Sequence, residues 1–293
     1  MPFLQAIVTN DVSRLAVGQG AYAAYLTPQG RMLTDFELYR RPAAVVASVA
    51  PGLAAALAAR LDQLVFSEDV HVADESATTA EVLVIGGRSA ELVAEAFDLD
   101  VATLSGLAEL SQVDWQDGFV ARAGESLLPS FRVIAPAIRR PEIVSRFDAA
   151  GLGAMSPALV EGLRIEAGRP EFGADMTAET IPLEAGLLER AISTTKGCYI
   201  GQEVIVRILH RGGGRIAKRL AILRIDPADA APRRGTRLEC VGREVGYLTS
   251  VASSPSDGGT IALGYVLRDL AREGQRFDLV GGSGTATVTG FAR

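Results

Sequence analysis

The sequence contains little of what metal and disulfide chemistry requires. Among 293 residues there are two cysteines, two histidines and one tryptophan. The cysteines, Cys198 and Cys240, form no Cys-x-x-Cys pair, and the histidines, His71 and His210, lie too far apart in sequence to suggest a ligand pair. A zinc or iron–sulfur site built from this chain alone is therefore not expected.

The chain also lacks a long uninterrupted apolar segment. Its longest apolar run, residues 43–59, is mostly alanine and contains Pro51-Gly52, which is too short and too broken for a membrane-spanning helix. The first residues show no basic segment followed by an apolar one, the pattern of a secretion signal. We therefore expect a cytoplasmic protein without a membrane partner.

Composition favours a globular protein of more than one domain. Hydrophobic residues make up 48% of the chain, and its length exceeds that of most single-core domains. The formal net charge of −6 argues against stable nucleic-acid binding. One stretch, residues 203–219, is basic although the chain as a whole is acidic, because it has five basic residues and one acid. It could hold the anionic tail of a ligand or RNA phosphates, or it could be a solvated basic loop.

Lysine is scarce, since arginine supplies 27 of the 29 basic residues. One of the two lysines opens the segment KGCYIGQE, residues 196–203, two places before Cys198. Ile200, Val204 and Ile208 follow at every fourth position, which predicts one buried face of a helix. Cys198 would then lie at the helix start, where unpaired N–H groups and the nearby ammonium favour a thiolate. The alternative is a small buried thiol.

Patterns along the first half predict an α+β protein. A helix is expected at residues 3–10, followed by a hairpin of strands 21–27 and 32–39 with its turn at 28–30. Residues 41–139 have the order β-α-β-β-α-β of a ferredoxin-like unit, with strands expected at 45–49, 70–73, 82–85, 119–123 and 131–134, one helix opened by Pro51 and another at 89–97.

The second half begins with helices and ends with strands. Helices are expected at residues 141–150 and 156–166, the second with Ser156 as its N-cap. After Gly212-Gly213-Gly214, short alternating runs predict a small antiparallel barrel or sandwich, with strands at 217–225, 236–241, 244–251, 260–266 and 285–291.

Residues 196–203 resemble the defining motif of the YgfZ-type folate-binding proteins, relatives of the glycine-cleavage aminomethyltransferase, or T-protein. Further segments are similar to this superfamily in the same order: TNDV at residues 9–12, LRIEAG at 163–168 and PLEA at 182–185. Lys196 and Cys198 resemble the YgfZ branch and not the transferases. The resemblance implies a three-part α+β fold: a folate-binding domain of residues 1–40 with 140–214, a ferredoxin-like domain of 41–139, and a C-terminal antiparallel β-barrel of 215–293.

The same resemblance implies a site for tetrahydrofolate or a one-carbon derivative. Tyr22 matches a tyrosine of the folate pocket, and Asp35 matches the aspartate that faces the reacting nitrogen. Arg164 matches an arginine that reaches the glutamate tail, and Glu125 corresponds to a further folate contact. Where the transferases have an additional aspartate, this chain has Thr34, which weakens the expectation of transferase chemistry.

Two functions follow from these matches. The YgfZ branch implies a tetrahydrofolate-binding accessory protein that supports the assembly or repair of iron–sulfur client enzymes, including those that thiolate tRNA. Cys198 would be its functional thiol and Lys196 would hold the thiolate, while Gln202 and Glu203 would fix the loop. The alternative is a folate-dependent aminomethyltransferase, which Asp35 favours. An RNA-binding module acting through the basic stretch is a third, weaker possibility.

Overall fold

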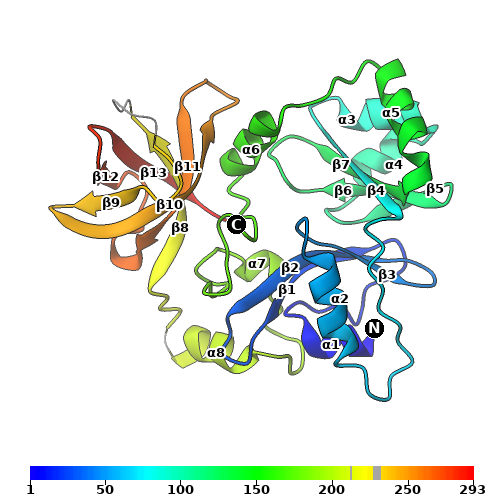
Figure 1. Ribbon diagram of the computed structural model, residues 1–293, viewed down its shortest axis with the longest axis horizontal. Helices are drawn as coiled ribbons and strands as arrows, with labels where there is room; N and C mark the ends of the chain where they lie inside the picture. Colours follow the sequence, from blue (N-terminus) through cyan, green and yellow to red (C-terminus); the bar gives the residue numbers. More distant parts are fainter. Residues whose placement is uncertain (212, 227–231) are drawn as a thin grey trace. The chain divides into compact units, whose positions relative to one another are not determined.

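The computed structural model describes residues 1–211, 213–226 and 232–293 (Figure 1). The chain forms two compact units, each assembled from segments that are distant in sequence. Unit 1 comprises Met1–Ala6, Asn10–Ala23 and Asp35–Ala154, and unit 2 comprises Ile7–Thr9, Ala24–Thr34 and Met155–Arg293. The first two strands, β1 (Gly20–Leu26) and β2 (Met32–Arg40), therefore each contribute residues to both units.

The predicted hairpin is present. β1 and β2 are neighbours in a three-stranded sheet that β3 (Val45–Ser48) completes. In the turn, the Gly30 N–H donates to Thr27 O at 2.9 Å, and Gly30 has a φ of +73°. A Cβ there would lie 2.7 Å from Val204 Cβ, so both the backbone conformation and the packing require glycine.

Two helices near the hairpin differ in extent from the prediction. α1 spans Pro2–Ile7 and does not continue to Asn10, because Val8 already forms an antiparallel bridge with Tyr25. α2 spans Ala54–Asp62, so Pro51 lies in the preceding turn and not in the first turn of the helix.

A second sheet lies entirely in unit 1. Its strands run in the order β4-β7-β6-β5, all antiparallel. Three helices contribute residues to the same apolar core, in which the Phe97 ring contacts Trp115 at 4.6 Å and Phe147 at 5.1 Å between centroids. The elements are β4 (Thr79–Ile85), α3 (Ser89–Phe97), α4 (Val101–Gly106), β5 (Gln112–Trp115), β6 (Gly118–Ala123), β7 (Ser130–Pro136), a 3₁₀ turn (Ala137–Arg139) and α5 (Arg140–Ala149).

The ferredoxin-like order predicted for residues 41–139 differs from this arrangement. Residues 70–73, the short Val-His-Val-Ala run, form no strand. β3 pairs with β2 instead of with the second sheet, and α4 and the four-residue β5 were not predicted. The α+β class is confirmed, but the order of helices and strands within residues 41–139 is β3-α2-β4-α3-α4-β5-β6-β7.

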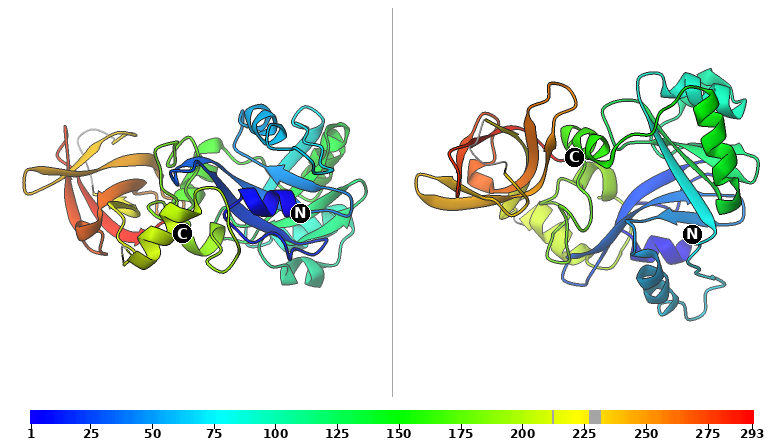
Figure 2. Two further views of the ribbon diagram at one scale, coloured as in Figure 1. Left: turned by 90° about the horizontal axis from the view of Figure 1, so that it is seen from below. Right: turned by 45° about the horizontal axis from the view of Figure 1, so that its top comes forward.

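Unit 2 contains the predicted C-terminal barrel, which is closed in the order β10-β11-β8-β13-β12-β9 (Figures 1 and 2). Alternate residues of its strands fill an apolar interior that includes Leu223, Leu248 and Phe277, as expected for a small closed sheet. The strands are β8 (Lys218–Ile225), β9 (Arg237–Cys240), β10 (Arg243–Ser253), β11 (Thr260–Leu267), β12 (Arg276–Leu279) and β13 (Thr285–Phe291), with a 3₁₀ turn at Arg268–Leu270.

The helices of unit 2 precede the barrel in sequence. They are α6 (Pro157–Glu166), α7 (Leu188–Ala191) and α8 (Gln202–Val206), and α8 continues as a π-helical turn over Arg207–Arg211. Ser156 caps α6 as predicted, its side chain accepting from the Leu159 N–H. Of the predicted glycine linker, Gly212 lies outside the described residues. The division into 1–40 with 140–214, 41–139 and 215–293 stays a prediction.

Within the described residues, no helix combines the length and the apolar character needed to cross a bilayer.

Candidate functional site

In unit 1 the structure brings together Tyr22 and Asp35, two of the predicted folate-binding residues. Tyr22 lies on β1 and Asp35 on the adjacent β2, and each is only 9% exposed. The Tyr22 hydroxyl donates a short hydrogen bond to the Asp35 carboxylate. Asn10 holds the backbone of β1 at this position, since its amide donates to Tyr22 O at 2.9 Å. The hydroxyl therefore holds one carboxylate oxygen of Asp35 in place.

The face of β2 that carries Asp35 continues into a cluster of charged residues. Glu37 shares this face because side chains two apart on a strand point to the same side. Arg132, from β7, forms ion pairs with Glu37 at 3.3 Å and, more closely, with Glu81 and Glu125. The predicted contact Glu125 is thus joined through Arg132 to the strand that carries Asp35.

Among the described residues, Arg132 is the only cation that contacts these three glutamates. Its side chain is 13% exposed, and that of Glu37 is 14% exposed. Burial by itself lowers the pKa of Arg132, but attraction to Glu37, Tyr39 and Glu81 outweighs it, so the pKa lies above its ordinary value. With Asp35, this part of unit 1 presents more hydrogen-bond acceptors than donors. It suits a ligand that offers N–H groups.

Glu37 and Arg132 were not predicted from the sequence. The available signal was an arginine inside the apolar run Phe131–Ala135 of a predicted strand, which would require buried partners. The glutamates that provide them come from two other strands and a loop, and no local pattern indicates that they meet.

In unit 2 the KGCYIGQE segment is mostly a loop. α8 begins at Gln202 after Gly201, which adopts a φ of +83°, and so Cys198 is in the loop and not at the helix start as predicted. A Cβ on residue 201 would lie 2.5 Å from Thr27 O, so close packing fixes this turn. The thiol of Cys198 is free and exposed, which excludes the alternative of a small buried thiol.

Two side chains hold this loop in place. Lys196 is 8% exposed and its ammonium donates to Val8 O at 2.6 Å, 5.2 Å from the centroid of the Tyr199 ring. Gln202 donates from its amide to Gly197 O at 3.4 Å. Burial raises the pKa of Tyr199 to about 12, so this hydroxyl stays protonated at neutral pH. Glu203 is exposed in the first turn of α8.

The helix face predicted after Cys198 is displaced by one residue. Ile205 is the buried residue of α8, whereas Ile200, Val204 and Ile208 are partly exposed. The change to a π-helical turn after Val206 alters the spacing, so a strict period of four does not describe this segment.

Arg164 lies in a separate network of unit 2. It is 8% exposed, and Asp175, an ion-pair partner at 2.6 Å, has a side chain that is 0% exposed. An arginine side chain has five N–H donors. Here all five are used, by Glu161 twice and by Asp175, Ser250 Oγ and Arg169 O.

The pKa of Arg164 agrees with this arrangement. Burial lowers it, but the hydrogen bond to Glu161 and the charge of Asp175 raise it above the ordinary value. Contact with a folate tail stays a prediction. In this structure it would require the guanidinium to give up one of its present acceptors.

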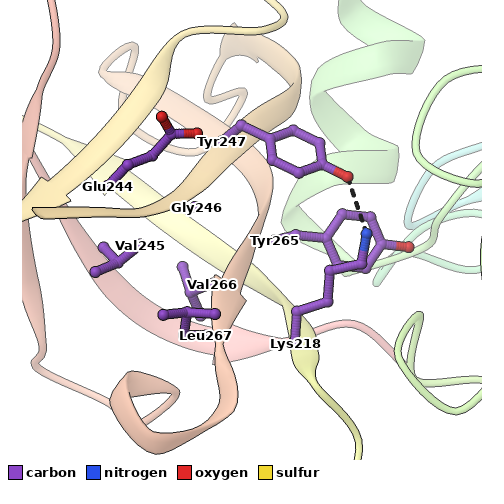
Figure 3. Close-up of a pocket in the computed structure, with 8 residues that line it drawn as sticks. All are labelled: Lys218, Glu244, Val245, Gly246, Tyr247, Tyr265, Val266 and Leu267. Atoms are coloured by element: carbon purple, nitrogen blue, oxygen red, sulfur yellow. Dashed lines mark hydrogen bonds between the residues drawn. The ribbon is translucent and has the colours of Figure 1, made fainter.

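Two cavities lie in unit 2, at one end of the barrel. The first, of about 230 Å³, is lined by β8, β10 and β11, and Figure 3 shows its residues. The second, of about 190 Å³, is lined by residues 174–180 together with barrel residues. None of the residues predicted for folate lines either cavity.

Comparisons with known proteins agree with this architecture. The model of the GCVT N-terminal domain matches residues 1–125, and that of the glycine cleavage T-protein C-terminal barrel domain matches residues 218–289. The fold is similar to that of the solved aminomethyltransferase T of the Bartonella henselae glycine cleavage system. The TM-score is 0.84 at 24% identity, over 98% of this chain and 80% of that one.

Relatives in sequence point to the same class. The chain is 30% identical to an aminomethyltransferase of Rubrobacter xylanophilus over 90% of its own length and 70% of the relative. It is 29% identical to an aminomethyltransferase of Nostoc over 94% of its length and 74% of that protein. The chain therefore belongs to the aminomethyltransferase, or glycine cleavage T-protein, family. The YgfZ branch stays a prediction from Lys196 and Cys198.

Proposed function

We propose that the chain binds a reduced folate at the face of β1 and β2 that carries Tyr22 and Asp35. The observation that supports this most directly is the buried Asp35 carboxylate, held by the Tyr22 hydroxyl, in a chain of the aminomethyltransferase family. A pterin ring presents several N–H donors, and the acceptors around Asp35 and Glu125 suit them. The residues present therefore fit the group.

Each side chain of this face would have a distinct task. The Asp35 carboxylate would accept a hydrogen bond from the reacting nitrogen and polarise it, and Tyr22 would keep that carboxylate oriented. Glu125, held by Arg132, would accept from the pterin edge. When bound, tetrahydrofolate supplies the nitrogen atoms that carry a one-carbon unit.

Aminomethyl transfer is the activity that the relatives favour, since those compared above are named aminomethyltransferases. Asp35 is the residue on which this activity would depend. Thr34, where the transferases have a further aspartate, does not remove a carboxylate from the Asp35 face, because consecutive strand residues point to opposite sides.

The second candidate is support of iron–sulfur client enzymes through Cys198. The free, exposed thiol favours it, as does a loop that Lys196 and Gln202 fix to its surroundings. In this role Cys198 would react with sulfur species or bind metal transiently together with a client protein. Folate and such clients would then be the partners of the chain.

Anaerobic calorimetric titration with tetrahydrofolate tests the shared part of both candidates. Asp35→Asn keeps the size of the side chain and should weaken binding by about 1.5 to 3 kcal/mol, the contribution of a hydrogen bond to a charged group. Asp278→Asn, an exposed change on the barrel, is the matched control and should bind normally. Equal affinity of both variants would place the folate site away from Asp35.

Two further measurements separate the candidates. Formation of methylene-tetrahydrofolate from an aminomethylated carrier protein, lost in Asp35→Asn and retained in Cys198→Ser, would establish the transferase. Loss of iron–sulfur enzyme activity in cells carrying Cys198→Ser, without transferase turnover by the wild type, would establish the accessory role.

A further inference from the structure

The two cavities of unit 2 share two lining residues, Lys218 and Tyr247. Figure 3 shows the Lys218 side chain running beside the Tyr265 ring, with its nitrogen directed at the Tyr247 hydroxyl. Its ammonium donates to the Tyr247 hydroxyl at 3.1 Å and lies 4.3 Å from the centroid of the Tyr265 ring. The two tyrosines, from β10 and β11, therefore hold the charged end of Lys218 at the boundary of both cavities.

The ammonium of Lys218 has donors left over. A lysine ammonium has three N–H groups, and Tyr247 is the one hydrogen-bond acceptor that contacts it among the residues the structure describes. Lys218 also forms no ion pair with any residue that the structure describes. A half-buried ammonium with unused donors beside a cavity is suited to an acceptor from outside the chain.

The acidic residues that line the cavities do not provide this acceptor, because each is paired with an arginine. Glu244 pairs with Arg237 at 2.7 Å, Glu179 with Arg31 at 2.7 Å, and Asp175 with Arg164 at 2.6 Å.

Arg234, the other basic residue of the second cavity, differs from these arginines. It donates to Gly173 O at 2.9 Å and forms no ion pair with any residue placed by the structure. Each acid that lines the cavities thus has an arginine partner, whereas Lys218 and Arg234 form no ion pair with a described residue.

One buried carboxylate sets the charge that a ligand would meet. Glu184 is 6% exposed and lies close enough to Lys218 for the two charges to interact. Its charge acts on Lys218 without occupying the lysine N–H donors. Because the Glu184 carboxylate lies near Lys218, a ligand with one negative charge is repelled less here than a dianion.

We propose that the second cavity binds a small carboxylate, held by Lys218 and Arg234. Its volume of about 190 Å³ lies below the usual range for drug-sized ligands, so the ligand is a short carboxylic acid. The hydroxyls of Thr180 and Tyr247 line the same cavity and are further hydrogen-bonding groups. None of its lining residues belongs to the proposed folate face of unit 1.

The scarcity of lysine allows a direct test. In the full chain labelled with ¹³C at lysine Cε, only Lys196 and Lys218 give signals. During titration with sodium propionate, against sodium chloride at equal ionic strength, the Lys218 signal should shift and saturate. The Lys196 signal should stay fixed, because its ammonium is buried against Val8 O, and it also reports whether each variant is folded.

Matched variants make the test specific. Arg234→Gln should weaken propionate binding about tenfold or more, as expected for loss of a charge-assisted hydrogen bond. Arg233→Gln removes the same charge from an exposed neighbour that does not line the cavity, and its affinity should stay within about twofold of the wild type.

Three results would overturn the proposal: a Lys218 signal that propionate does not move, equal effects of the two arginine variants, or saturation by inorganic phosphate in preference to propionate. None of these results depends on whether the chain binds folate, so this site and the proposed function can fail separately.

Discussion

Removal of the Arg164 side chain should destabilise unit 2 strongly. The guanidinium uses all five N–H groups within the chain, and its partner Asp175 is completely buried. Arg164→Ala would leave the Asp175 carboxylate with the hydroxyls of Thr249 and Ser250 and the Glu171 N–H, but without a countercharge. Loss of one partner of a buried ion pair costs about 3 to 5 kcal/mol, so we expect the free energy of unfolding to fall by that amount.

Urea denaturation followed by far-UV circular dichroism measures this effect. The only tryptophan, Trp115, lies in unit 1, so its fluorescence alone would not report on unit 2. Arg237→Ala is the control, because it breaks an ion pair of the same unit whose side chains are 64% and 50% exposed, and such a pair contributes about 1 kcal/mol or less. Arg164→Lys should keep the charge but lose the forked contacts, and fall between the two.

A free energy of unfolding for Arg164→Ala within about 1 kcal/mol of the wild-type value, the range of an exposed pair, would refute this expectation. That result would mean that Arg164 is not a structural residue, and a role in ligand binding would regain support. If the expected loss is found, weak folate binding by Arg164 variants reports instability and not a missing contact with the ligand.

Three further outcomes are expected. Tyr22→Phe should weaken tetrahydrofolate binding by about 1.5 to 3 kcal/mol; calorimetry showing full affinity would mean that the hydroxyl does not orient Asp35 for the ligand. Cys198→Ser should change the free energy of unfolding by less than about 0.5 kcal/mol, since the residue is exposed, and a larger loss in urea denaturation would point to a packing role. Burial raises the pKa of Glu184 in the folded chain, so its contribution to stability is present at low pH and is lost as pH rises through the folded pKa. Glu184→Gln should therefore lessen the fall in stability as pH rises above 4.5, and parallel pH curves for both proteins would argue against this carboxylate as the cause.

Regular local patterns predicted much of the fold. Alternation gave five of the barrel strands, and the Pro-Gln-Gly turn gave the hairpin that places Tyr22 beside Asp35. β12, Arg276–Leu279, also alternates between exposed and buried residues, so the sequence contains a signal for the sixth barrel strand as well.

Other features depend on partners that no local pattern identifies. Arg164 meets Ser250, which is 86 residues away in sequence, and the arginine alone does not indicate whether its acceptors belong to the chain or to a ligand. The start of α8 was placed too early because apolar spacing continues through residues 198–201, whereas Gly201, packed against Thr27 O, delays the helix until Gln202.

The segmented make-up of unit 2 has a consequence for biosynthesis. Residues 7–9 and 24–34 leave the ribosome early, but the remainder of the unit begins only at Met155. The last residues also take part, since the Ala292 N–H donates to Leu220 O at 3.1 Å. Such long-range closure is slow relative to local folding, so residues 7–9 and 24–34 of the nascent chain remain without their partners until Met155–Arg293 has been made, and they are candidates for chaperone binding.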